Sequence, residues 1–328
     1  MPIIEPLPTT FRGRPFLVRE ATAAGLSRSR LRSSDLIAPF RGVRGDPLAR
    51  DLVGRCRALQ LVSPRAFFSH STAARLFEVP LPLRLGNEGL LHISVFEPVR
   101  APSIAGTSSH QLRPADALAG EVIAPGARFG ALRNWTGISI SSPALTWCLL
   151  AGQVSVPDLV AAADFLVSGT HPFCSIADLE AAVAARAGQR HVRALVRAIA
   201  LVRVGPRSRR ESHARLLFGA AGLPEPELNT NILTDDGRFL AMSDLVWRVF
   251  RVAGEYEGER HQEKGQFRKD ILRRERVEDH DWRLFRFTGD DLRLRPRETI
   301  LRVSNRLGLH VPPARMRAAL ALAAEIAL

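Results

Sequence analysis

The chemistry-bearing residues of this sequence gather in the stretch GEYEGERH, residues 254–261, where acids interrupt a segment that otherwise reads as a buried strand. Residues two apart in a strand point to the same face, so Glu255 and Glu257 are expected to project together. The apolar segment around Asp244 reads as a second strand, and its spacing from Glu255 fits two antiparallel strands joined by a tight turn near residues 249–250. We therefore expect three carboxylates to meet at one edge of a sheet.

Carboxylates held this close repel one another and raise each other's pKa unless a cation neutralises them. Mg²⁺, which prefers oxygen ligands at about 2.1 Å, is the expected cofactor, and Mn²⁺ can substitute for it. Such an ion polarises a scissile phosphate and helps to generate hydroxide, which is the chemistry of phosphodiester hydrolysis. His261 could orient the attacking water or protonate the leaving oxygen. A solvent-facing strand with ordinary surface acids is the alternative, but the apolar neighbours of the acids favour an interior strand and a metal site.

The elements that must position these acids follow a joint near residues 203–213, where Gly, Pro and a basic cluster predict a domain boundary. Beyond this joint the pattern predicts a helix, three strands, a charged helix, a strand and a closing helix. These elements are expected at residues 209–222, 228–234, 237–247, 251–258, 266–279, 281–288 and 295–308. This order predicts a mixed sheet flanked by helices.

The front of the chain carries a second pattern. Residues 18–34 read as a short helix, a turn at Gly25 and a second helix capped by Ser27, and residues 37–46 could form the strand pair of a wing. This is the outline of a helix-turn-helix, although a generic helical hairpin gives the same pattern. The candidate phosphate contacts behind the cap are Arg28, Arg30 and Arg32.

Residues 51–204 read as a mostly helical middle region with a few strands, the clearest of which is at residues 91–96. This region has no recognisable catalytic constellation. Its histidines are isolated in the sequence, and an isolated His is more often a hydrogen-bonded structural residue than a ligand. We therefore expect structural roles for His70, His92, His110, His171 and His191.

The composition limits the class of protein. The chain has 328 residues, enough for two or three domains, and no apolar run that could cross a bilayer. Its N-terminus lacks an export signal, and its three cysteines are far apart and lack CxxC spacing, which argues against disulfides and a zinc site and fits a reducing cytoplasm. The net charge of +13 is almost wholly arginine, a side chain suited to forked contact with phosphate. Nucleic acid is therefore the expected partner, although genomic base composition alone could give an Arg-rich chain.

The C-terminal third of the chain resembles a known family. The segments RESHARLLFGAAGLPEPELN, GRFLAMSDLVW and VAGEYEGERHQEKGQFRKD, followed by ILRRERVEDHDWRLFRFTGDDL, look like the endonuclease domain related to very-short-patch-repair (Vsr) endonucleases. That domain is a branch of the PD-(D/E)xK nuclease fold. Several motifs occur in the right order, so the resemblance is specific. It implies a metal-dependent nuclease domain.

The resemblance also implies roles for single residues. Asp244 and Glu255 would be metal-binding carboxylates, and Glu257 would stand where the wider superfamily usually has a lysine that helps to activate water. Since that lysine is missing, the general base is open, with His261 as first choice and Lys264 as second. The resemblance further implies acids on two helices, Glu211 and Asp270, and phosphate-facing arginines, Arg273 or Arg274 and Arg286. The two helical acids could equally complement a helix dipole or form helical ion pairs.

The front of the chain resembles a different family. FLVREATAAGLSRSRLRSSDLIAPFRGVRGD, followed by SHSTAARLFEVPLP, is similar to the winged-helix N-terminal domain of type IV (AbiEi-like) abortive-infection antitoxins. This resemblance implies docking on duplex DNA through the helix that starts at Ser27. Proteins that join such a domain to a Vsr-like domain are a recognisable architecture.

Together these observations predict an α/β fold of the α+β type. We expect a winged-helix domain at residues 1–50, the middle region at 51–204 and a PD-(D/E)xK nuclease domain at 205–328. The expected function is Mg²⁺-dependent DNA endonuclease activity, in DNA repair or phage defence, with duplex DNA and a toxin or repair protein as partners. The alternative is a DNA-binding transcriptional regulator or antitoxin whose nuclease-like domain no longer cleaves. An RNA nuclease or an enzyme for damaged bases is a third reading.

Overall fold

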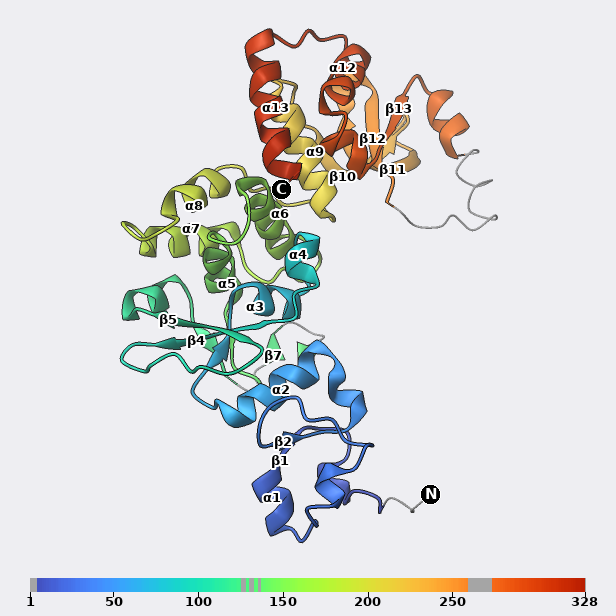
Figure 1. The fold of residues 1–328 in the computed structure, drawn as a ribbon. Coiled ribbons are helices and arrows are strands. Elements are labelled where there is room, and N and C mark those ends of the chain that lie inside the picture. The colour runs from blue at the N-terminus through green and yellow to red at the C-terminus, as the bar shows by residue number, and fades with distance from the viewer. Residues whose placement is uncertain (1–4, 125–127, 130–132, 135–136, 259–272, 328) are drawn as a thin grey trace. The chain divides into compact units, whose positions relative to one another are not determined.

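The computed structural model describes residues 5–124, 128–129, 133–134, 137–258 and 273–327 (Figure 1). Its helices and mixed sheets confirm the α+β class. The chain forms two compact units, each with its own internal contacts. Unit 1 comprises residues 1–150 and 177–190, and unit 2 comprises residues 151–176 and 191–328. In the described residues, no helix is both long and apolar enough to cross a membrane.

This division differs from the boundary expected near residue 205. Unit 2 also contains α6 (Val156–Val167) and α8 (Val192–Ile199), which the sequence pattern placed in a separate middle region. Buried ion pairs explain the difference. Asp164 on α6 accepts a hydrogen bond of 2.5 Å from Nη2 of Arg215, which lies on the first helix beyond the expected boundary. The Gly–Pro joint at residues 203–213 is therefore a connection inside unit 2.

Unit 1 consists of short elements. Its helices are α1 (Val18–Ala23), α2 (Leu52–Val62), α3 (His70–Leu76), α4 (Leu83–Gly86), α5 (Pro143–Leu150) and, apart from its first residue, α7 (Ile176–Ala185). Its 3-10 helices are η1 (Thr9–Phe11), η2 (Arg30–Arg32), η3 (Pro47–Arg50) and η4 (Pro114–Ala119). Its strands are β1 (Phe16–Leu17), β2 (Val43–Arg44), β3 (Phe67–Phe68), β4 (Leu91–Phe96), β5 (Thr107–Leu112), β6 (Val122–Ile123), β7 (Arg128–Phe129), β8 (Arg133–Asn134) and β9 (Ile140–Ser141).

The first fifty residues match the expected helix-turn-helix only in part. Helix α1, the turn at Gly25 (φ 92°) and the cap at Ser27 are present, and the Ser27 hydroxyl accepts the backbone N–H of Arg30 at 3.1 Å. The expected second helix is only the 3-10 turn η2, so that prediction was wrong. The physical reason lies in the serines of this segment, whose hydroxyls compete with the helical backbone for hydrogen bonds. The Ser33 hydroxyl, for example, donates to the Arg30 carbonyl at 2.6 Å.

The larger sheet of unit 1 has five strands in the order β5-β4-β3-β9-β6. Strands β4 and β5 are parallel, β3 is antiparallel to β4 and parallel to β9, and β6 is antiparallel to β9. Helix α3 is held beside β4, because the Ser69 and Ser94 hydroxyls are 2.7 Å apart and the backbone N–H of His92 donates to the Thr72 hydroxyl at 2.7 Å. This packing brings the start of α3 over the first two strands of the sheet.

Unit 2 contains the elements that carry the predicted acids. Besides α6 and α8 its helices are α9 (Arg209–Ala220), α11 (Gly289–Arg293), α12 (Pro296–Leu307) and α13 (Pro313–Ala327), with the 3-10 helix η5 (Arg248–Phe250) and a helical segment at residues 273–278. Its strands are β10 (Glu227–Leu233), β11 (Phe239–Trp247), β12 (Val252–Tyr256) and β13 (Arg283–Phe287). The predicted helix, three strands, strand and helix are confirmed, and the terminal helix α13 was not foreseen.

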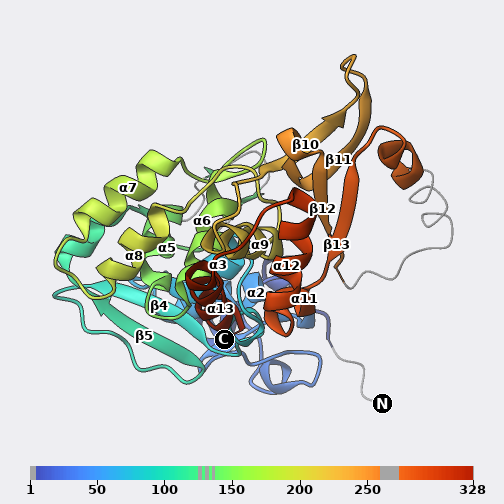
Figure 2. The same cartoon turned by 90° about the horizontal axis from the view of Figure 1, so that it is seen from above.

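The four strands of unit 2 form a mixed sheet in the order β10-β11-β12-β13, with β12 and β13 parallel and the other pairs antiparallel. Helices α9, α12 and α13 cover one face, where Phe218 and Phe285 belong to the larger core (Figure 2). Val277, on the helical segment at residues 273–278, packs with Ala253 and Trp282 in a smaller core on the other face. The sheet is therefore covered on both faces, as an interior acid-bearing strand requires.

Gly254 fits the sheet because it has no side chain. It pairs with Leu245 on β11 and Phe285 on β13, and a Cβ atom at Gly254 would fall against the buried ring of Phe285. We expect Gly254→Ala to lower the free energy of unfolding by about 1–3 kcal/mol, the usual cost of overpacking a core. The exposed Gly258 is the matched control, because a Cβ there meets only the Tyr256 ring at 3.5 Å. Urea unfolding of both variants tests this, and equal midpoints would show that the ring yields freely.

Candidate metal and phosphate site

Asp244 and Glu255 lie side by side where the pairing of β11 with β12 ends. The register runs from Trp247↔Val252 to Leu245↔Gly254. Beyond it the Asp244 carboxylate replaces a backbone acceptor, because its Oδ2 accepts the backbone N–H of Tyr256 at 2.7 Å. The tight turn that the spacing predicted is present as η5. The sequence therefore predicted the neighbourhood of these two acids correctly.

The electrostatic environment of Asp244 disfavours its ionised form. Burial, together with the negative charges of Glu211 and Glu255, raises the pKa of this carboxyl group to about 6. The hydrogen bond from the Tyr256 N–H and the charge of Arg207 act in the opposite direction. Three acids from α9, β11 and β12 therefore share one neighbourhood. A cation placed among them would relieve the repulsion.

Glu211 has a structural task as well as this electrostatic one. It is buried in the first turn of α9, where its Oε2 accepts the backbone N–H of Arg207 at 2.8 Å and the Nδ2 of Asn229 at 2.6 Å. The first contact closes the N-terminus of the helix, since Ser208 caps the same turn by accepting the N–H of Glu211 at 3.2 Å. Glu211 thus stabilises the start of α9 and also belongs to the acid group around Asp244.

Glu255 and Glu257 are each paired with an arginine that the sequence assigned to phosphate. Oε1 of Glu255 accepts a hydrogen bond from Nη2 of Arg273, and Ser243 lies 3.3 Å from the same oxygen. Oε1 of Glu257 accepts from Nη1 of Arg286 at 2.6 Å. Glu257 is not among the groups that shift the pKa of Asp244. The acid group around Asp244 is therefore Glu211 and Glu255 rather than Glu255 and Glu257.

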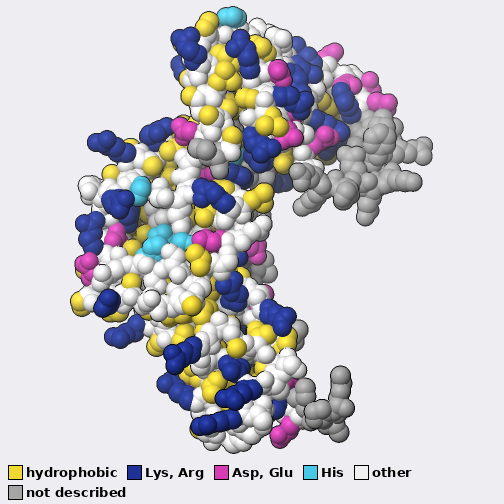
Figure 3. Space-filling view, viewed as in Figure 1, with side chains coloured by type: hydrophobic (Ala, Val, Ile, Leu, Met, Phe, Trp, Pro, Cys, Tyr) yellow, Lys and Arg dark blue, Asp and Glu magenta, His cyan; other side chains and the backbone are white. Residues whose placement is uncertain are grey.

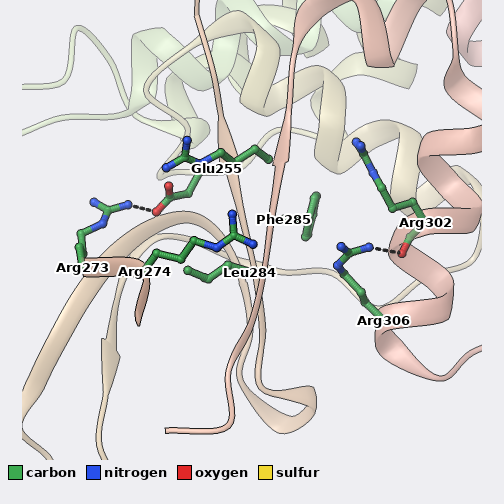
Figure 4. A pocket seen from close by; sticks show the side chains of 8 residues that line it. Glu255, Arg273, Arg274, Leu284, Phe285, Arg302 and Arg306 are labelled. Carbon is green, nitrogen blue, oxygen red and sulfur yellow. Dashed lines mark hydrogen bonds and ion pairs between the residues drawn. The ribbon is translucent and has the colours of Figure 1, made fainter. Parts of the chain in front are cut away.

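A cavity of about 130 Å³ opens beside Glu255 and is lined mainly by arginines (Figure 4). Its other wall comes from β13 and α12, with the aromatic ring of Phe285 between them. All of these elements belong to unit 2. The arginines that line the cavity are Arg273, Arg274, Arg286, Arg302 and Arg306. The three arginines of this unit that were predicted to contact phosphate, Arg273, Arg274 and Arg286, thus line one cavity.

The arginines of the cavity repel one another as the acids do. Burial and the charges of Arg302, Arg274 and Arg283 lower the pKa of Arg306. Nε and Nη2 of Arg302 are buried and donate no hydrogen bond to any described residue. Guanidinium groups in this state favour a bound anion, and a phosphate offers the fork of oxygens that they bind best. Glu255 borders both groups, so the acids and the arginines form one continuous site.

Three predicted residues lie outside the described part of the chain. These are His261, the first choice for general base, Lys264, the second choice, and Asp270, the acid predicted on the following helix. Arg274, which the sequence could pair with Asp270, donates to Glu278 at 2.7 Å.

The predicted DNA contacts of unit 1 divide into two kinds. Arg28 and Arg32 are exposed, as a phosphate contact must be. Arg30 is 7% exposed, and its guanidinium group donates to both carboxylate oxygens of Asp35 at 3.0 and 2.9 Å and to the Ser33 hydroxyl at 2.5 Å. Arg30 therefore holds the loop after η2 together instead of facing solvent. Elsewhere on the face shown in Figure 3, Lys and Arg side chains are dispersed rather than gathered in one patch.

The sequence missed a second cluster of potential ligands. His70, His92 and His110 were expected to be isolated, but their ligand atoms all lie within 4.8 Å of one another in unit 1. Within the described ranges no other group of three His, Cys, Asp or Glu meets that distance, so the acids around Asp244 are more loosely spaced. No local spacing signals this cluster, because β4, β5 and α3 are brought together only by tertiary packing.

The residues of the acid group fit Mg²⁺ in donor type and charge. Their oxygens are the hard ligands that this ion prefers. The pKa of Asp244 is raised mainly by burial and in part by the charges of Glu211 and Glu255, which a divalent cation would neutralise. Asp244 and Glu255 are the residues that would hold it, with Glu211 behind them. Glu257, which was also predicted as a ligand, is held in its ion pair with Arg286.

The shifted pKa of Asp244 predicts a pH-dependent penalty. Burial and the neighbouring acids raise the pKa of its carboxyl group from the ordinary 3.8 to about 6, so the folded state binds the proton more tightly. Stability is therefore lost as the pH rises through this window, and the loss is complete above it. Asp244→Asn should be more stable than the wild type by about 1–3 kcal/mol at pH 8 and equal to it below pH 4. Asp279→Asn, at an exposed acid, is the control in urea unfolding, and a destabilised Asp244→Asn at pH 8 would contradict this prediction.

Comparison with known proteins adds relatives of unknown activity. No family model matches the chain. Uncharacterized proteins MT2308 and Rv2248 of Mycobacterium tuberculosis, from strains CDC 1551 / Oshkosh and ATCC 25618 / H37Rv, are each 28% identical to it over 270 residues, which cover 81% of this chain and 89% of the relative. No solved structure matches. The chain is thus similar to mycobacterial proteins over most of its length, and the geometry of its site carries the functional argument.

Proposed function

We propose that the protein is a Mg²⁺-dependent DNA endonuclease that hydrolyses phosphodiester bonds at the acid and arginine site of unit 2. The observation that carries this proposal is that a group of acids lies directly beside a group of arginines. Acids around Asp244 favour a cation, arginines around Arg306 favour an anion, and Glu255 borders both. A divalent metal bound to a phosphodiester satisfies the two groups together.

The position of each residue in the site suggests its role. Asp244 and Glu255 hold the metal, and Glu211 adds negative charge from α9. Arg302 and Arg306 position the phosphate and stabilise the charge that develops on its oxygens. Nε and Nη2 of Arg302 donate no hydrogen bond to a described residue, and the nearest charge is Oδ2 of Asp291, 3.7 Å from Nη2. When bound, Mg²⁺ supplies Lewis-acid polarisation of the phosphate and a more acidic water. Arg273 must release Glu255 when the site fills.

Asp244→Asn should abolish cleavage, with a loss of at least roughly 10²-fold, the order found when one principal electrostatic group is removed from a site. DNA affinity should stay the same or rise slightly, because a negative charge near phosphate disappears. The assay is nicking of supercoiled plasmid and of a T·G-mismatched duplex with Mg²⁺, Mn²⁺ or EDTA.

Asp279→Asn serves as the control and should cleave like the wild type, since Asp279 is an exposed acid outside the site. A metal readout accompanies the assay, because millimolar Mg²⁺ should raise the melting temperature of the wild type but not that of Asp244→Asn. Undiminished cleavage by Asp244→Asn would remove this residue from the mechanism.

The ion pairs inside the site favour a second candidate, a DNA-binding regulator or antitoxin without cleavage. Arg273 and Arg286 already neutralise Glu255 and Glu257, as they would in a domain that has kept its fold as a binding surface. The nicking assay separates the two candidates. Duplex binding with no cleavage under any metal condition, and no Mg²⁺ effect on melting, would favour the regulator.

Both candidates require unit 1 to bind duplex DNA through its exposed arginines. Replacing Arg28 and Arg32 together by Ala should weaken binding and reduce the salt dependence of log K by up to about two units of slope, one for each lost phosphate contact. Arg30→Ala should instead lower stability, because Arg30 is buried against Asp35. Binding titrations at several salt concentrations test this. An unchanged slope for the double variant would exclude this segment as the docking element.

A further inference from the structure

Three imidazole rings meet in unit 1 where α3 begins above strands β4 and β5. His92 lies on β4 and His110 on β5, and His70 is the first residue of α3. The His70 and His110 rings stack with centroids 3.9 Å apart, and the His92 and His110 rings are 5.1 Å apart. His70 and His92 are buried and His110 is partly exposed, so the cluster sits just beneath the surface.

The hydrogen bonds around the rings select one nitrogen of each for a common centre. Nδ1 of His70 lies 2.9 Å from the Ser69 hydroxyl, and Nε2 of His92 lies 3.0 Å from Oε1 of Glu88. Nε2 of His70 and Nδ1 of His92 take no part in these two contacts. Nδ1 of His92 and Nε2 of His110 are hydrogen-bonded to each other at 2.9 Å, so one of the two rings donates to the other. Two nitrogens bound to one tetrahedral zinc ion lie roughly 3.3 Å apart, so this separation is close to that of two ligands.

Glu88 gives the cluster the second contact that metal-binding histidines usually have. A carboxylate that accepts the outer N–H of an imidazole fixes the tautomer and makes the inner nitrogen a better ligand. Glu88 does this for His92, and its other oxygen accepts the Ser71 hydroxyl at 2.9 Å. The carboxylate is thus held in place by Ser71 on α3 and by His92 on β4.

The backbone and the charge state agree with a ligand role. His70 has a φ of 51°, a left-handed conformation that is uncommon for a residue with a side chain. Burial lowers the pKa of His70, and burial together with His92 lowers that of His110 to about 4. Neutral imidazole is the form that binds metal, and the lowered pKa of His70 and His110 favours it. The nearby positive charge of Arg186 is balanced by Asp116, 2.6 Å away.

We propose that His70, His92 and His110 bind a divalent transition metal, with zinc as the preferred ion, through Nε2, Nδ1 and Nε2 respectively. Three nitrogen ligands in a compact group suit zinc and leave a fourth position for water. Mg²⁺ is excluded by chemistry, because it prefers oxygen ligands and gives up its water reluctantly. The site is separate in residues and in metal type from the acid site of unit 2, and it does not depend on the proposed nuclease activity.

The test uses full-length protein without a polyhistidine tag, stripped with EDTA and titrated with Zn²⁺ against a chromophoric chelator. The proposal predicts one Zn²⁺ per chain for the wild type, lost in His92→Ala and in His110→Ala. Glu88→Gln should keep the stoichiometry and lower the affinity roughly 10–100-fold, as loss of a carboxylate behind a ligand does. His171→Ala, at an exposed His, is the control and should bind Zn²⁺ like the wild type.

Co²⁺ provides a readout that needs no variant. The stripped wild type loaded with Co²⁺ should show the intense visible absorption of a four-coordinate centre with nitrogen ligands, and Zn²⁺ should displace it. Binding of less than one Zn²⁺ per chain would overturn the proposal. Full stoichiometry in both His92→Ala and His110→Ala, or a weak six-coordinate Co²⁺ spectrum, would overturn it as well. Circular dichroism of the variants separates a lost ligand from a lost fold.

Discussion

Two buried aspartates on α6 fix helix α9, and the candidate site of unit 2 depends on where that helix lies. Asp158 accepts from Arg209 at 2.6 Å and from His213 at 3.0 Å, and Asp164 accepts from Arg215 at 2.5 Å. Breaking one partner of such a pair costs about 3–5 kcal/mol, because the other charge stays buried. With α9 held in this way, its first turn brings Glu211 toward Asp244 while its apolar side packs on the sheet. A buried ionic contact thus determines which acids can meet at the sheet edge.

The site carries its own counter-ions. The acids around Asp244 and the arginines around Arg306 are each unfavourable alone, and the Arg273–Glu255 ion pair joins them. In the absence of ligand this ion pair keeps the sheet edge stable. A ligand that brings a cation and a phosphate together offers each group a better partner, so binding requires only that ion pairs be exchanged and not that the fold change. The same argument explains why an inactive descendant could keep the arrangement, since the internal pairs are stabilising without any ligand.

Sequence reasoning reached the parts of this molecule that local pattern determines. Alternating and apolar runs predicted the four strands of unit 2, and a two-residue period with a short turn predicted that Asp244 and Glu255 would be neighbours. It failed where tertiary partners decide. Arg30 looked like a phosphate contact until Asp35 was seen to bind it, and the segment around it is a 3-10 turn because serine hydroxyls compete with the helix. The compact units do not divide at the expected boundary, because ion pairs tie α6 to α9 across the expected joint.

The histidine cluster also could not be predicted from local sequence pattern. His70, His92 and His110 come from three elements whose meeting depends on parallel pairing of β4 with β5 and on α3 packing above them, none of which a local motif encodes. Its nitrogen ligands and the oxygen ligands of unit 2 would also select different ions, since affinity for imidazole favours transition metals whereas carboxylates suit Mg²⁺. Mg²⁺ would therefore not displace a transition metal from the three imidazoles, because nitrogen ligands disfavour it.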